Sequence, residues 1–155
     1  MDFQISGLPV TPFSALFGLS DTELAKHGAV RHVATKSPGF PCRVSLRDAQ
    51  PGETLLLLNY EHLDVATPYR SRYAIYVKEH ATEAHLSVNE VPDVLRHRLL
   101  SLRAFDKQGM LLDADVTEGR SVEPMIARMF ERPEVDYIHV HNAKPGCFAA
   151  RVDRA

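Results

Sequence analysis

The chain contains only two cysteines, Cys42 and Cys147, which is too few for a scaffold stapled by disulfides. They lie far apart in the sequence and therefore lack the Cys-x-x-Cys spacing of zinc and redox sites. We expect two free thiols in a reducing compartment. The sequence leaves open whether the two thiols lie close together in the fold.

An excess of charge of one sign is also missing. Eighteen Lys and Arg against twenty Asp and Glu give a formal net charge of −2, so no global field attracts the chain to nucleic acid or anionic lipid. The longest apolar run, Leu55 to Leu58, is far shorter than the roughly twenty residues that span a bilayer. The N-terminal segment MDFQISGLPV lacks the basic and apolar regions of a secretory signal. We therefore predict a cytoplasmic protein with no nucleic-acid or membrane partner.

The motifs of the common enzyme classes are absent. The sequence has no Gly-rich phosphate loop, no Gly-x-Ser-x-Gly elbow, no His-Glu-x-x-His and no dinucleotide fingerprint. These absences disfavour the enzymes that such motifs mark, and no cofactor can be identified from the sequence.

The composition is that of one globular domain. Apolar residues make up 45% of the 155 positions and charged residues 25%, which is ordinary for a domain with one core. No internal repeat, low-complexity segment or proline-rich linker divides the chain. We predict a single domain over residues 1–155.

Local patterns predict helices and strands in irregular order. Ser20 can cap the amide of Glu23 and begin a helix, for which Gly28 offers a stop after about two turns. A second helix follows Ser121, with a core-packing stripe of Val122, Met125, Ile126, Met129 and Phe130. Strands are expected at residues 30–35, 42–46, 54–60, 73–78, 99–105, 110–117, 135–141 and 147–153. This order predicts an α+β domain with a mixed, mainly antiparallel sheet and two or three short helices.

Two of these strands carry specific expectations about burial. Leu55 to Leu58 is apolar without alternation, so we expect a central strand that is covered on both faces. The strand over residues 110–117 alternates, which predicts a half-buried strand with one apolar and one acidic face. The apolar face carries Met110, Leu112, Ala114 and Val116, and the other carries Asp113 and Asp115.

The end of the chain predicts a hairpin whose loop covers residues 142–146. The expected cross-strand pairs are His141 with Cys147, His139 with Ala149, and Tyr137 with Arg151. An apolar face then carries Ile138, Val140, Phe148, Ala150 and Val152, and a polar face carries Tyr137, His139, His141, Cys147 and Arg151. A slip of one residue would exchange the two faces.

The polar face of this hairpin is open to three interpretations. Alternate histidines on a strand can ligate zinc together with a cross-strand thiolate, with His62 as a further ligand. His141 can instead serve as the base for a nucleophilic Cys147. In the third interpretation these side chains are structural or orient a ligand. We name Cys147, His141 and His139 as candidate catalytic residues and assign no metal ligand.

Further candidates lie in two other segments. On an extended segment Arg43 and Arg47 share a face and can grip a carboxylate or phosphate, although exposed arginines paired with acids would look the same. The exit of the Leu-rich strand and the loop after it hold tyrosines and charged groups, in the kind of place where scaffolds display functional side chains. The candidate ligand-binding residues are Arg43, Arg47, Tyr60, His62, Tyr69, Arg70 and Asn142.

Five segments are informative when they are taken together: Pro41 to Glu53, Leu55 to His62, Pro68 to Arg70, His139 to Ala143, and Gly146 to Phe148. In combination they resemble a bacterial family of unknown function, the domain-of-unknown-function family 1203. The resemblance covers about residues 30–154 and implies a bacterial single-domain protein, without an activity or a catalytic residue to carry over. The stretch Ala74 to Val77 departs from the Pro-Ile-Phe-Val-like sequence expected there.

These observations support three hypotheses of different classes. The first is a site that binds a small anionic ligand and that could also be catalytic. It would form where the Arg43 segment, Tyr60 to His62 and the polar hairpin face converge. The second is a non-catalytic protein-interaction domain that uses Tyr69 and Arg70, types enriched at interface hot spots. The third is a metal-binding protein. The oligomeric state stays open.

Overall fold

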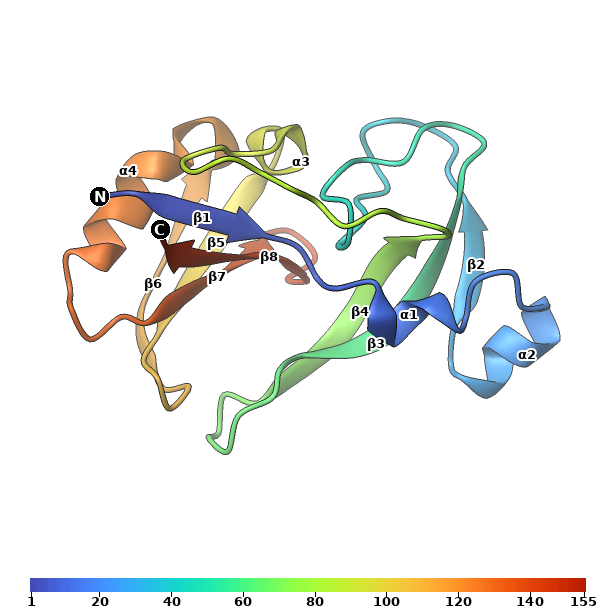
Figure 1. Cartoon of the computed structure of the whole chain (residues 1–155), viewed down its shortest axis with the longest axis horizontal. Helices are drawn as coiled ribbons and strands as arrows, with labels where there is room; N and C mark the ends of the chain where they lie inside the picture. The colour runs from blue at the N-terminus through green and yellow to red at the C-terminus, as the bar shows by residue number, and fades with distance from the viewer.

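The computed structural model describes all 155 residues as one α+β domain with two antiparallel sheets (Figure 1). The five-stranded sheet has the order β1-β8-β7-β5-β6 and the three-stranded sheet the order β2-β3-β4. The predicted class and the mainly antiparallel pairing are confirmed, and the strands are divided between two sheets. The strands are β1 (Phe3–Ser6), β2 (Val30–Val33), β3 (Thr54–Leu63), β4 (Ser71–Lys78), β5 (Leu99–Phe105), β6 (Leu111–Glu118), β7 (Tyr137–Asn142) and β8 (Phe148–Arg154).

The helices are short and lie outside both sheets. They are α1 (Thr11–Ser14), α2 (Asp21–Lys26), α3 (Asp93–Arg96), the 3-10 turn η1 (Gly119–Ser121) and α4 (Val122–Phe130). The expected cap of α2 is present, because the Ser20 hydroxyl accepts the Glu23 amide at 3.2 Å. Gly28, with φ of 67°, follows the end of this helix as expected. None of the helices is both long enough and apolar enough to cross a lipid bilayer.

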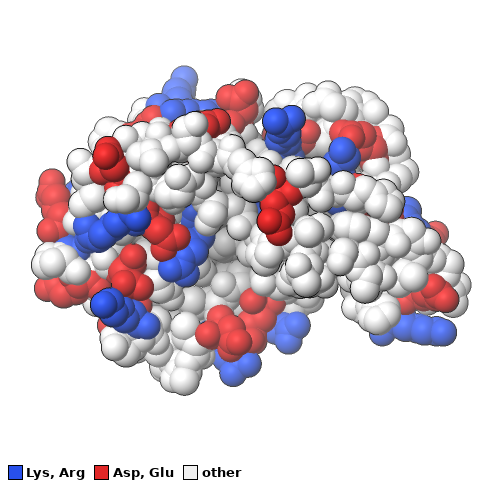
Figure 2. All heavy atoms as spheres, viewed as in Figure 1, with Lys and Arg blue, Asp and Glu red and all other residues white.

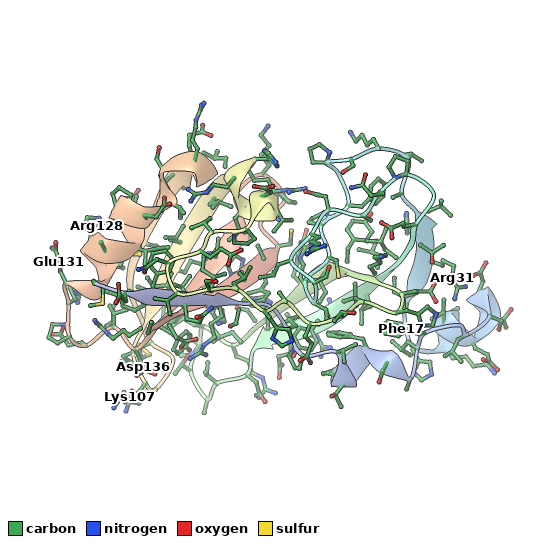
Figure 3. The ribbon with its side chains drawn as sticks, turned by 45° about the horizontal axis from the view of Figure 1, so that its top comes forward. Phe17, Arg31, Lys107, Arg128, Glu131 and Asp136 are labelled. Atoms are coloured by element: carbon green, nitrogen blue, oxygen red, sulfur yellow. The ribbon has the colours of Figure 1, made fainter.

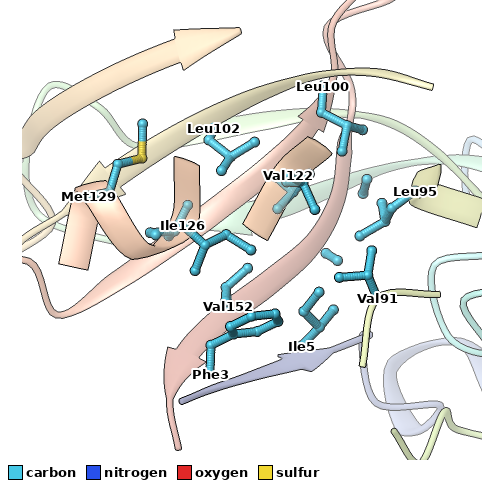
Figure 4. Packing of buried hydrophobic residues seen from close by; sticks show 14 of the residues in the cluster. Phe3, Ile5, Val91, Leu95, Leu100, Leu102, Val122, Ile126, Met129 and Val152 are labelled. Atoms are coloured by element: carbon cyan, nitrogen blue, oxygen red, sulfur yellow. The ribbon is translucent and has the colours of Figure 1, made fainter. Parts of the chain in front are cut away.

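Helix α4 covers one face of the five-stranded sheet and forms the main core (Figure 4). Its predicted stripe is confirmed: Val122, Ile126 and Met129 are fully buried and Phe130 nearly so. Opposite them lie Leu100 and Leu102 of β5, together with the inward residues of β7 and β8. Dense packing of this kind fixes the sheet that carries the polar face on its other side.

The expected faces of the strand over residues 110–117 are reversed. Asp113 and Asp115 pair across the ladder with core-facing residues of β5 and therefore lie on the side of α4, where both carboxylates accept hydrogen bonds from Arg128. Met110 and Val116 are 42% and 51% exposed. Because β6 is the sheet edge, its acids can reach a cation on the helix without losing contact with water. A bulge in β6 places Leu112 against the main core.

Strand β3 is the centre of the three-stranded sheet, as predicted from its unbroken apolar run. Leu55 and Leu56 point to opposite faces and both are fully buried, in two different apolar clusters. Beyond this run β3 continues to Leu63, and its end reaches the five-stranded sheet, where Leu63 packs against Phe105 and Tyr137.

The expected strand over residues 42–46 is instead a turn, which we call the inter-sheet turn (residues 41–48). It is closed by a bridge between Pro41 and Asp48, and Leu46 takes φ of 53°. The Arg43 amide donates to Tyr76 of β4 at 3.1 Å. Gly7 lies directly against the turn, since a Cβ there would be 2.6 Å from the Arg43 carbonyl oxygen. Alternating residues looked strand-like, but these non-local contacts fold the segment back on itself.

Candidate ligand-binding pocket

The hairpin of β7 and β8 has the predicted polar and apolar faces but a different register. His139 pairs with Arg151 and Tyr137 with Asp153, so the pairing is shifted by two residues from the expected one. An even shift preserves the faces, and Ile138, Val140, Ala150 and Val152 all enter the main core as expected.

The aromatic ring of Phe148 lies on the other face from the one predicted. A bulge between Val140 and His141 makes Phe148 the partner of His141 and lets Ala149 join the core. The Phe148 ring therefore stacks on His62 with centroids 5.5 Å apart. The same bulge removes the expected pair of His141 with Cys147 and leaves Cys147 in the turn before β8, where its sulfur accepts hydrogen bonds from other residues.

A pocket of about 450 Å³ lies between the two sheets beside this turn. Its walls come from β3 and β4, from the inter-sheet turn, from the segment after α3 and from the β7–β8 turn. We call it the Arg43 pocket. Residues on its walls include Arg43, Leu57, Tyr73, Ile75, Tyr76, His97, Arg98, Asn142, Lys144 and Cys147.

Arg43 is buried in the wall of this pocket, with only 2% of its surface exposed. Its Nε donates to the Phe148 carbonyl oxygen at 2.7 Å, Nη1 to the Pro41 carbonyl oxygen at 2.6 Å, and Nη2 to the Cys147 Sγ at 2.8 Å. No carboxylate lies within ion-pair distance of it. Burial lowers the pKa of Arg43, but a guanidinium stays protonated in proteins. The pocket wall therefore contains a buried positive charge without a carboxylate.

Cys147 and Asn142 complete the polar wall. The Cys147 Sγ accepts from Arg43 and, at 3.6 Å, from the Asn142 Nδ2. Both residues are more than nine-tenths buried, and the Asn142 Oδ1 has no hydrogen-bond partner. The His141 Nδ1 is engaged with the Gly146 carbonyl oxygen at 2.9 Å. The structure thus gives Cys147 an arginine and an amide as neighbours in place of the expected histidine.

Two further cations line the pocket but differ in how they are paired. Arg98 donates to both carboxylate oxygens of Asp48, at 2.6 and 3.0 Å, which neutralises its charge. Lys144 is exposed on the β7–β8 turn and has no carboxylate within 4.0 Å. The uncompensated positive charge therefore comes from Arg43 and Lys144.

A second polar group, the histidine cluster, lies on the polar face of β7 and consists of His62, His139 and His141. The ring centroids of His62 lie 5.1 Å from His141 and 6.1 Å from His139. Burial lowers the pKa of His139 and of His141 to about 3, and burial followed by the charge of Arg103 lowers that of His62. These imidazoles are therefore neutral at pH 7. No group of three or more His, Cys, Asp or Glu side chains has a geometry that could hold a metal ion.

The remaining predicted residues are not brought together with the pocket. Arg47 is exposed and lines a separate polar depression of about 1010 Å³. Tyr60 packs on Phe13, with centroids 5.2 Å apart. Tyr69 and Arg70 lie in the β3–β4 loop, where Arg70 makes two 3.0 Å hydrogen bonds to Glu61. Of the candidate residues, only Arg43, Asn142 and Cys147 meet in the pocket.

Sequence reasoning missed several wall residues, notably His97, Arg98 and Lys144. His97 and Arg98 reach the pocket through tertiary folding alone, so no local pattern marks them. The two cysteines are both free, and Cys42 is 1% exposed. Its sulfur accepts backbone amides of Ser45 and Lys78 at 3.5 and 3.3 Å, and it does not line the pocket.

Comparison with known families identifies the family of this chain. A family model described as a protein of unknown function, DUF1203, matches residues 39–154. The chain belongs to this family. No curated protein and no solved structure shows a significant match. The DUF1203 match contains every wall residue of the Arg43 pocket and the whole histidine cluster, whereas β1, α1, α2 and β2 lie outside it.

Proposed function

We propose that this protein binds a small molecule with an anionic group in the Arg43 pocket, and that it does so in the bacterial cytoplasm. The observation that carries the proposal is the buried Arg43 guanidinium without a carboxylate. The cellular setting is part of this proposal, and it is supported by the sequence resemblance to a bacterial family and by the two free thiols, which fit a reducing compartment.

The energetics favour an anion as the missing partner. A buried charge costs several kcal/mol unless it is paired and hydrogen-bonded. Two carbonyl oxygens and a sulfur satisfy part of the Arg43 guanidinium, but the second N–H on each terminal nitrogen has no protein acceptor. A carboxylate or phosphate can accept hydrogen bonds from such N–H groups and supply the missing charge.

The rest of the pocket indicates the body of the ligand. A volume of about 450 Å³ suits a small metabolite rather than a polymer. The pocket wall also has an aromatic and aliphatic part, contributed by Tyr73, Tyr76, Leu57 and Ile75. Lys144, on the turn beside the pocket, can add a second contact to the anionic group. We therefore expect an amphipathic ligand with a compact apolar body.

The surface elsewhere does not favour the other two hypotheses. Basic and acidic side chains are interspersed on the face seen in Figure 2, without a broad patch of one sign. Arg70, central to the protein-interaction hypothesis, is already engaged by Glu61. The histidine cluster lacks a metal-binding geometry.

Calorimetric titration with matched pairs of small carboxylates and their neutral amides tests the proposal. We expect carboxylates to bind the wild type about tenfold or more tightly than the amides, and Arg43→Gln to remove this preference. Arg70→Gln, at an exposed ion-paired arginine, is the matched control and should bind as the wild type does. Equal affinity for acids and amides in the wild type would refute an anion site.

A further inference from the structure

We infer that Cys147 is a nucleophile toward small electrophiles that carry a carboxylate, so that the pocket forms a covalent thioether or thioester with its ligand. This inference rests on the proposed anion site. It adds a chemical class of substrate, namely carboxylates with an electrophilic carbon close to the carboxylate group.

The position of the sulfur carries the inference. Cys147 Sγ lies 2.8 Å from Arg43 Nη2, the nitrogen whose second N–H has no protein acceptor. An anion held by that N–H brings its neighbouring carbon close to the sulfur, toward the roughly 3–3.5 Å separation of a near-attack geometry. The anion site and the nucleophile thus share one guanidinium.

The donors around the sulfur suit a developing negative charge. Arg43 and the Asn142 amide both donate to the Cys147 Sγ. Reactive cysteines lie in electropositive, partly accessible surroundings, and Cys147 keeps 7% of its surface exposed, at the pocket wall. The unpartnered Asn142 Oδ1 is a second buried polar atom that the protein alone leaves unsatisfied.

Cys42 supplies an internal comparison. Its sulfur accepts two backbone amides and no side-chain donor, and Cys42 belongs to an apolar cluster, is 1% exposed and lies outside the pocket. A reagent that reacts through general thiol chemistry after unfolding would modify both cysteines. A reagent guided by the pocket would modify Cys147 alone.

The reaction balances without a cofactor. The Cys147 sulfur attacks the electrophilic carbon, an S–C bond forms, and the bond to the leaving group breaks with its electron pair. The thiol proton passes to solvent water. With iodoacetate the leaving group is iodide, and the product is a carboxymethyl thioether whose carboxylate stays beside Arg43.

The test compares iodoacetate with neutral iodoacetamide, and peptide mapping by mass spectrometry follows each cysteine. We expect Cys147 to react faster than Cys42, with an iodoacetate-to-iodoacetamide rate ratio about tenfold above that of a free cysteine peptide. Arg43→Gln should return this ratio to the peptide value, and Arg70→Gln should keep it. Thermal unfolding of each variant verifies that it is folded.

Asn142→Asp keeps the inference falsifiable if Arg43→Gln fails to fold. It sets a carboxylate against the sulfur that Arg43 also contacts and should shift the ratio toward iodoacetamide. Equal labelling of the two cysteines, or a Cys147 ratio equal to that of the free peptide, would overturn the inference. If carboxylates bind by calorimetry but Cys147 is not labelled selectively, the nucleophile is refuted and the anion site is retained. If carboxylates do not bind and Cys147 is not labelled selectively, both the anion site and the nucleophile are refuted.

Discussion

The Arg43 pocket and the histidine cluster adjoin at the same junction between the two sheets, yet they hold their polar groups in opposite ways. Phe148 lies between them, with its carbonyl oxygen bonded to Arg43 and its ring stacked on His62. An imidazole can lose its proton, so the cluster accommodates burial by staying neutral. A guanidinium cannot, so the pocket retains a charge that requires a partner.

Glu79 shows how the same fold treats a buried charge that is purely structural. It is 8% exposed, and Arg31 donates to it at 2.6 Å, which lowers the pKa of Glu79 to about 2. Arg31 lies at the α2 and β2 end of the molecule, labelled in Figure 3. Compared with this complete ion pair, Arg43 lacks a counter-ion within the chain. The difference separates a structural charge from one available to a ligand.

The largest expected effect tests the neutrality of the histidine cluster. Because His139 and His141 have pKa values of about 3 when folded and a reference value of 6.5, the unfolded chain binds more protons below pH 6.5. The free energy of unfolding therefore has its full value above pH 6.5 and decreases as the pH falls from 6.5 toward 3. Between pH 8 and pH 5 we expect a loss on the order of 4 kcal/mol for the pair, measured by urea unfolding.

The double variant His139→Gln, His141→Gln should remove most of this loss. His85→Gln, which removes an exposed imidazole, is the matched control. If the double variant and the control lose the same stability between pH 8 and pH 5, the cluster is not kept neutral by burial.

Removing the buried charge gives the next largest effect. Arg43→Gln leaves the Pro41 and Phe148 carbonyl oxygens without their donors, so we expect a loss of about 3 kcal/mol in the free energy of unfolding. Arg70→Gln should cost less than about 1 kcal/mol, because its ion pair is exposed. Equal losses would mean that the two arginines are held alike.

A change behind the inter-sheet turn should disturb the Arg43 pocket without altering any of its side chains. Gly7→Ala places a methyl group 2.6 Å from the Arg43 carbonyl oxygen and must push the inter-sheet turn. We expect a loss of about 2 kcal/mol and weaker carboxylate binding, by chemical denaturation and calorimetry. Gly18→Ala, which has free space but a backbone φ of 75° and lies outside the pocket wall, is the control: it should lose stability through backbone strain and keep carboxylate binding. Unchanged binding in Gly7→Ala would show that the pocket does not depend on this turn.

The smallest effect distinguishes stability from function. Asn142→Asp supplies the pocket with a carboxylate and should raise the free energy of unfolding by about 1 kcal/mol while it weakens anion binding. Asn59→Asp makes the same change beside exposed Arg72, where the Asn59 Oδ1 already accepts at 2.5 Å, and should alter stability by less. A decrease for Asn142→Asp alone would contradict the need for a counter-ion at Arg43.

The sequence predicted what local chemistry determines. The Ser20 cap, the α4 stripe and the central place of Leu55 to Leu58 each depend on neighbours in the chain, and each is confirmed. The two-residue periodicity of β7 also predicted correctly that the histidines lie on the face opposite the apolar residues. The predicted pairing of β7 with β8 was nevertheless shifted by two residues from the observed one.

What failed depends on contacts between distant segments. Residues 42–46 alternate like a strand, but Gly7 and Tyr76 hold them in a turn. The bulge beside His141 places Phe148 next to the histidines and Cys147 next to Arg43, which differs from the predicted register. No local sequence pattern predicts this bulge. For the same reason the sequence patterns identified Arg43, Asn142 and Cys147 as candidates but did not predict that these three residues share a site. They predicted a site of Cys147 with His141 instead.

The N-terminal strands have a practical meaning for work on this family. Residues 1–38 precede the DUF1203 match, yet they supply β1 to one sheet and β2 to the other. A truncation that begins at residue 39 would uncover β8 and β3 along their whole paired length and remove Phe3 and Ile5 from the core. Uncovered edges of this kind promote self-association, so such a fragment would report on aggregation rather than on the pocket.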